Sequence, residues 1–79
     1  MNSQYEVSLL QSKMEQVGKI LAGELFKEVE SECHRYSEEG KPTLVACKLR
    51  IETVSGKKLH MEGTLLKNKE ESLTLIVRY

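Results

Sequence analysis

The sequence predicts an α+β fold in which a long N-terminal helix packs on a three-stranded antiparallel meander. Two observations carry this prediction. Apolar residues recur every three or four positions in the first half of the 79-residue chain, and every second position in the second half. The change of period near residue 40 marks the passage from helix to sheet. A chain of this length forms one domain at most, so we expect residues 1–79 to fold as a single α+β unit.

Residues 5–39 are predicted to form the helix. The helix ends at Gly40, because Pro42 cannot continue it. Gly18 and Gly23 interrupt the segment, each at a cost of about 1 kcal/mol relative to Ala, so a bend or break near Gly18–Gly23 stays open as an alternative. The apolar stripe at helical spacing comprises Leu10, Met14, Val17, Leu21, Leu25, Val29, Cys33 and Tyr36.

Three strands are predicted at about 43–53, 57–67 and 72–79. Their odd-numbered positions are mostly apolar and their even-numbered positions mostly polar, which is typical of a sheet with one buried face. Odd residues must therefore face odd residues across the first hairpin. A three-residue loop with Gly56 in the left-handed conformation meets this condition. It sets Ile51 opposite Leu59 and Leu49 opposite Met61 on the inner face, and Glu52 opposite Lys58 and Lys48 opposite Glu62 on the outer face.

The predicted helix is too long for the predicted sheet. It would span roughly 50 Å, whereas strands of this length span roughly 23–40 Å. Unless the helix breaks and folds back, its overhang and the open sheet edges favour a homo-oligomer, most simply a dimer. The candidate oligomer interface comprises Leu10, Met14, Val17 and Leu21 of the helix and Leu75 and Val77 of the last strand.

Charge is divided unevenly between the two halves of the chain. Residues 1–40 carry four basic and eight acidic residues, and residues 41–79 carry eight basic and four acidic residues, so the whole chain is neutral. Either an acidic helix attracts a basic sheet, or the outward sheet face contacts phosphates or an acidic protein. The candidate contact residues are Lys48, Arg50, Lys58, His60 and Arg78. No aromatic residue falls on the outward positions of the three predicted strands, which argues against base stacking.

The residue types present disfavour most catalytic and metal chemistry. The chain contains no Asp, so calcium loops and Ser-His-Asp triads lack their usual oxygen donor. Cys33 and His34 are adjacent and would point about 100° apart on a helix, and no Cys/His spacing matches a zinc module. Gly56 and the two lysines after it do not form a phosphate-binding loop. We expect no enzyme, no cofactor and no metal.

The two cysteines and the apolar runs bear on the cellular compartment in which the protein is expected. Cys33 is predicted on the helix and Cys47 on a strand, so we expect two free, half-buried thiols in a reducing cytoplasm, with a disulfide as the alternative. Apolar runs of two to four residues predict no membrane span, and the N-terminus lacks the features of a secretory signal.

Residues 54–65 (Val-Ser-Gly-Lys-Lys-Leu-His-Met-Glu-Gly-Thr-Leu) resemble the first motif of Sm-like proteins. That family places a helix before a strand, a glycine turn and Leu-x-x-x-Gly-x-Leu on a bent strand, so the resemblance implies a bend at Gly63 and RNA binding. Asn68 and Ser72 stand where the family has an Asp and an Asn that contact bases. A helix followed by an antiparallel sheet is also similar to half a hot-dog fold.

These observations favour a non-catalytic small protein that self-associates and binds a protein partner, as adaptors and inhibitors do. The alternative is an RNA- or DNA-binding module that contacts phosphates through the basic outer sheet face. A small-ligand or enzymatic role at a subunit interface is the third hypothesis.

Overall fold

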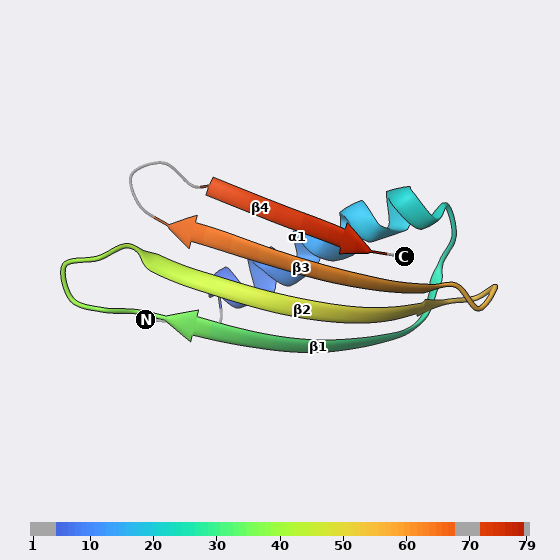
Figure 1. Cartoon of the computed structure of the whole chain (residues 1–79), viewed down its shortest axis with the longest axis horizontal. Coiled ribbons are helices and arrows are strands. Elements are labelled where there is room, and N and C mark those ends of the chain that lie inside the picture. Colours follow the sequence, from blue (N-terminus) through green and yellow to red (C-terminus); the bar gives the residue numbers. More distant parts are fainter. Residues whose placement is uncertain (1–4, 68–71, 79) are drawn as a thin grey trace.

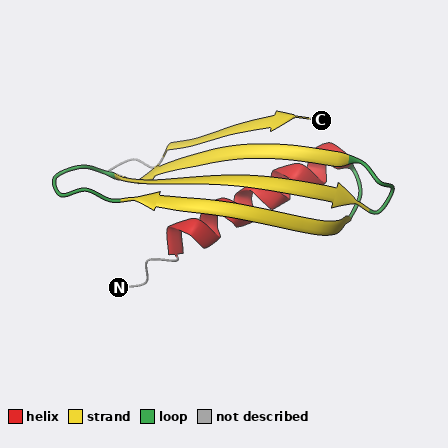
Figure 2. Ribbon diagram, turned by 60° about the horizontal axis from the view of Figure 1, so that its bottom comes forward, coloured by secondary structure: helices red, strands yellow, loops and turns green. Residues whose placement is uncertain are grey.

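A computed structural model of the chain describes residues 5–67 and 72–78. One helix, α1 (Tyr5–Ala22), is followed by four strands, β1 (Phe26–Tyr36), β2 (Thr43–Thr53), β3 (Lys58–Lys67) and β4 (Ser72–Arg78). The strands pair antiparallel in the order β1-β2-β3-β4, and α1 crosses one face of the sheet diagonally (Figures 1 and 2). The predicted α+β class, with a helix packed on an antiparallel meander, is confirmed.

The helix is about half as long as the sequence predicts. The prediction of one helix over residues 5–39 is wrong in its second half, and the chain breaks where the glycines left that alternative open. Gly23 has a φ of 69°, in the left-handed region, and its N–H donates to the carbonyl of Lys19 at 2.9 Å. This closes the last turn of α1 and turns the chain towards the sheet.

Strand β1 takes the place of the second half of the predicted helix, so the sheet has four strands instead of three. It pairs with β2 from Phe26 opposite Thr53 to Tyr36 opposite Leu44, with a bulge after Phe26. Residues four apart lie on one side of a helix but also on one face of a strand. The spacing of Val29 and Cys33 therefore fits both structures, and pairing with β2 decides between them.

The predicted hairpin between the second and third elements of the sheet is confirmed residue by residue. Leu49 lies opposite Met61, and Lys48 lies opposite Glu62. Gly56 has a φ of 92°, and the N–H of Thr53 donates to the carbonyl of Lys57 at 2.9 Å. The sequence predicts a bend at Gly63. The pairing of β3 with β2 and the pairing of β3 with β4 both run through Gly63 without a shift in register.

The core lies between α1 and one face of the sheet. The helix contributes buried residues four apart, ending at Gly18 and Ala22. A Cβ at Gly18 would lie 3.0 Å from Met61 Sδ and from Phe26 Cζ, so glycine lets the helix approach the sheet closely. An 18-residue helix spans about 27 Å and does not overhang strands of 11 residues, so the premise that favoured an oligomer through the helix is wrong. The core comprises Leu10, Met14, Ala22, Val45, Cys47, Leu49, Ile51, Leu59, Met61 and Leu65.

A disulfide joins Cys33 of β1 to Cys47 of β2. The expectation of two free thiols is wrong, because it rested on placing Cys33 in a helix. In the sheet the two residues lie directly opposite each other with their Cα atoms 4.1 Å apart. Such close cross-strand spacing brings the two sulfur atoms within bonding reach.

Candidate protein-binding surface

The face of the sheet opposite α1, called the outer face below, carries no other element of the described chain (Figure 1). Its residues alternate along each strand with those of the core. It comprises Glu28, Glu30, Glu32, His34 and Tyr36 of β1, Leu44, Ala46, Lys48, Arg50 and Glu52 of β2, Lys58, His60, Glu62, Thr64 and Leu66 of β3, and Thr74 and Arg78 of β4.

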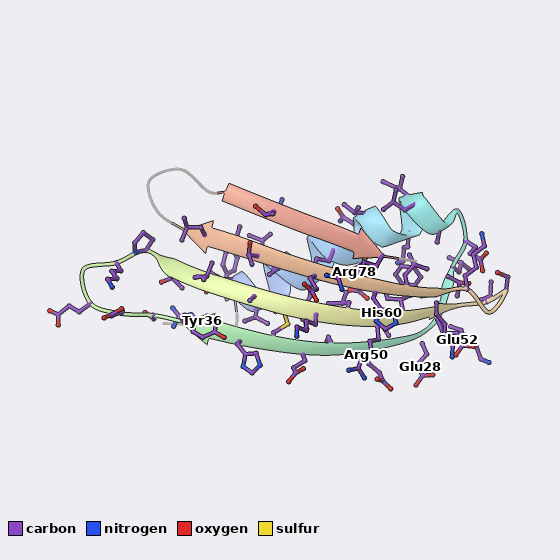
Figure 3. The ribbon with its side chains drawn as sticks, in the orientation of Figure 1. Glu28, Tyr36, Arg50, Glu52, His60 and Arg78 are labelled. Atoms are coloured by element: carbon purple, nitrogen blue, oxygen red, sulfur yellow. A yellow bond between two sulfur atoms is a disulfide. The ribbon has the colours of Figure 1, made fainter. Side chains whose placement is uncertain are left out.

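The register brings the five basic residues predicted as contacts onto this one surface. Arg50, His60 and Arg78 share a row across β2, β3 and β4, and Figure 3 shows them as neighbours. Lys48 lies in the next row along β2, and Lys58 lies at the hairpin end of β3. Whether they contact a partner stays a prediction.

Sequence reasoning missed the carboxylates that lie among these basic residues. Glu30 lies beside Arg50, and Glu32 lies beside Lys48. The outer face therefore carries five Glu against four Lys and Arg. The signal that could have found them is the alternation of polar residues at even positions in 28–36. The five carboxylates are those of Glu28, Glu30, Glu32, Glu52 and Glu62.

Ion pairs on the outer face are few and long. Arg78 Nη2 lies 3.9 Å from Glu62 Oε2. Within the described chain, Lys48, Arg50 and Lys58 are exposed and form no ion pair within 4.0 Å, although each has a Glu beside it on a neighbouring strand. These cations are therefore available to the charges of another molecule.

Hollows open to solvent mark the outer face, and two of them are defined by their lining residues. The first has a volume of about 270 Å³ and lies beside Arg50 and His60 at the hairpin end. The second, of about 410 Å³, exists because the small residues Ala46, Thr64 and Thr74 lie between taller side chains such as Tyr36. Both hollows are open to solvent, unlike the pockets that bury most of the surface of a small ligand.

The fold places the residues of the predicted oligomer interface in different parts of the molecule. Leu10 and Met14 are 0% exposed in the core of their own protomer, so their assignment to an interface is wrong. Val17 is partly buried against the same core, and Leu21 is 48% exposed. Leu75 and Val77 lie opposite Gly63 and Met61 in β4, and their side chains lie outside the described part. Their role stays a prediction.

The structure also bears on the cysteine thiols, on metal binding and on membrane insertion. Cys33 and Cys47 are bonded to each other, so neither supplies a thiolate. Residues 5–67 and 72–78 contain no cluster of three or more His, Cys, Asp or Glu side chains suited to a metal ion. Over the same residues, no helix has the length and apolar character to cross a membrane.

Glu24 ties the β2–β3 hairpin to the segment between α1 and β1. Its carboxylate accepts hydrogen bonds from the backbone N–H of Ser55 at 2.8 Å and from the Ser55 hydroxyl at 2.7 Å. Lys57 Nζ lies 3.7 Å away. Hydrogen bonding by the Thr53 side chain and by Ser55, together with the charge of Lys57, lowers the pKa of Glu24 to about 2. These contacts join Glu24 to the β2–β3 hairpin, which lies at one end of the outer face.

Comparison of the chain with protein-family models, curated proteins and solved structures found no match. The resemblance of residues 54–65 to Sm-like proteins therefore gains no support from a family match.

Proposed function

We propose that the chain is a non-catalytic protein-binding module of the adaptor or inhibitor type, which self-associates and contacts proteins through the outer face. One observation carries this proposal. α1 covers one face of the sheet and builds the core there, while the other face stays uncovered and carries unpaired charges of both signs around hollows lined by small residues. Protein surfaces offer the mixed charge and the projecting side chains that such a face complements.

The arrangement of charges disfavours the nucleic-acid alternative. Lys48 has Glu32 on one side and Glu62 on the other, so a phosphate chain laid across the sheet meets carboxylates wherever it meets cations. Nucleic acids present closely and evenly spaced negative charge, which such a surface repels as much as it attracts. Tyr36, at the edge of the sheet, is the single Phe, Tyr or Trp among the described outer-face residues, whereas base-stacking platforms use several.

The disulfide bears on where the module works. Structural disulfides persist in oxidising compartments and are rare in the cytosol. The Cys33–Cys47 bond therefore favours an oxidising compartment over the cytoplasm predicted from the sequence, and the location stays a proposal.

The experiment compares three immobilised full-length proteins. The first is the wild type, the second reverses two outer-face charges (Arg50→Glu with Lys58→Glu), and the third reverses two charges elsewhere (Lys13→Glu with Lys41→Glu). Each is exposed to extract of the source cells and to mixed DNA and RNA oligonucleotides at 50 mM salt. We expect one protein to bind the wild type and the control, and to bind the outer-face variant at least tenfold more weakly.

Two results would contradict the proposal. Equal capture by all three proteins would show that the outer face is not the contact surface. Oligonucleotide retention at 50 mM salt that is lost by 200 mM salt would support the nucleic-acid alternative instead. Circular dichroism of each variant shows whether the fold is intact.

A further inference from the structure

We propose that the outer face binds a second copy of the chain, packed face to face about a two-fold axis that runs parallel to the strands, midway between β2 and β3. The inference rests on the proposed function, because it names an occupant of the same surface. It is carried by the cross-strand register of β2 and β3 together with the positions of the charged residues.

A two-fold axis in this position has a simple geometric consequence. It turns one copy over so that β2 of one copy lies over β3 of the other, and each outer-face residue lies over the partner copy of its own cross-strand neighbour. The β2–β3 register within one copy therefore becomes the set of contacts between two copies.

The pairs produced in this way are complementary. Lys48 lies over the second copy's Glu62, and Glu52 lies over its Lys58, and both pairs occur twice by symmetry. At the other end of the face, Leu44 lies over Leu66. Between these regions the small residues Ala46 and Thr64 let the two sheets approach. Arg50 lies over His60, whose imidazole nitrogen can accept a hydrogen bond from the guanidinium group.

The outer strands obey the same rule. β1 of one copy lies over β4 of the other, and Glu30 lies over Arg78 because the two residues share a row with Arg50 and His60. No carboxylate of the described outer face lies over another carboxylate. Figure 3 shows Glu28 and Glu52 at one end of the face and Tyr36 at the other.

Other two-fold axes give poorer matches. An axis between β1 and β2 overlaps two strands instead of four and places Glu28 over the second copy's Glu52. An axis perpendicular to the strands through the central row lays Glu32, Lys48 and Glu62 each over its own copy, so that like charges face each other. Like charges placed opposite each other disfavour an interface.

The size of the face indicates a weak dimer. Four strands spaced by about 4.8 Å and roughly ten residues long give about 600 Å² per copy, at the lower end of specific interfaces. We therefore expect a dissociation constant on the order of micromolar that rises with salt. Sheets packed face to face are rotated by about 30°, so pairs near the centre keep their match best. Lys48 and Glu62 form such a central pair.

The experiment measures molar mass by light scattering at 100 μM protein in 50 mM salt. The wild type should have about twice the monomer mass of 9.0 kDa. Lys48→Glu and Glu62→Lys should each be monomeric, because each places like charges over one another. An equimolar mixture of the two variants should return to twice the monomer mass, because every central pair is then of opposite charge. Loss of an ion pair within one copy cannot explain rescue by mixing.

Matched controls are Lys41→Glu and Glu38→Lys, exposed residues of the β1–β2 loop that should leave the dimer unchanged. A monomeric wild type, a mixture that stays monomeric, or a dimer unchanged at 500 mM salt would each overturn the inference. A dimer broken by Lys48→Glu but not by Glu62→Lys would favour the axis between β1 and β2 and overturn it too. If the chain is monomeric yet partner capture still depends on Arg50 and Lys58, the inference and the proposed self-association fail, and the binding of a protein partner stands.

Discussion

The two faces of the sheet are built from the same strands and differ in how far their side chains are exposed to solvent. On the inner face Val45, Leu49 and Leu65 are at most 1% exposed, whereas on the outer face Lys48, Arg50 and Thr64 are exposed. Alternate residues of one strand therefore serve two purposes, packing under the helix and presenting polar groups to another molecule. Substitutions on the two faces should accordingly change two different measurements.

The largest expected difference between the faces compares two neighbours in β3. Leu65→Ala removes a buried side chain and should lower the free energy of unfolding by about 2–5 kcal/mol, because the cavity cannot fully collapse. Thr64→Ala, one residue away on the outer face, should change it by about 0.5 kcal/mol or less. Urea unfolding followed by circular dichroism measures both. Equal losses would show that the outer face is packed in the monomer.

A second test concerns β1, whose inner face is covered only in part. Val29 is still 36% exposed there, so the disulfide and the pairing with β2 hold this edge strand. Reducing the Cys33–Cys47 bond, which closes a loop of about 15 residues, should lower the free energy of unfolding by about 3 kcal/mol. Urea unfolding with and without dithiothreitol measures this change, and the variant with both cysteines replaced by Ala should not respond to the reductant.

Hydrogen exchange sharpens the same test. After reduction, exchange should accelerate in residues 26–36 more than in 58–66, because β1 opens without the rest of the sheet. Identical stability with and without reductant would mean that the bond contributes nothing to folding.

The sequence predicts β2 and β3 well because two independent patterns agree there. The apolar parity fixes the inner face, and the pairing of Glu52 with Lys58 and of Lys48 with Glu62 fixes the same register from the outer face. β1 escapes prediction because its inner positions include Ser31 and Arg35, which blur the alternation. Its Glu residues and its apolar residues four apart also favour a helix when tertiary pairing is unknown.

The candidate surface was predictable in part for the same reason. The basic residues of the strands that were recognised fall on one face, as their even positions require. The sequence pattern places the carboxylates of β1 on a helix, so the surface that it predicts to be basic is in fact of mixed charge. The disulfide was missed with the strand, since only strand pairing places Cys33 opposite Cys47.

The smallest expected effect concerns Glu24, whose carboxylate accepts hydrogen bonds from Ser55 of the β2–β3 hairpin. Its pKa is lowered from 4.5 to about 2, so the folded protein favours the charged carboxylate, and this contribution to stability is present above pH 4.5 and lost as the pH falls towards 2. Glu24→Gln should therefore unfold at a lower temperature than the wild type near pH 6, and the difference should shrink between pH 4.5 and pH 2. Ser55→Ala, which removes one hydroxyl donor but keeps the carboxylate, should show a smaller shift of the same kind. Melting temperatures at steps of half a pH unit measure both variants. A difference that stays constant from pH 6 to pH 2 would show that the charge of Glu24 does not hold the hairpin.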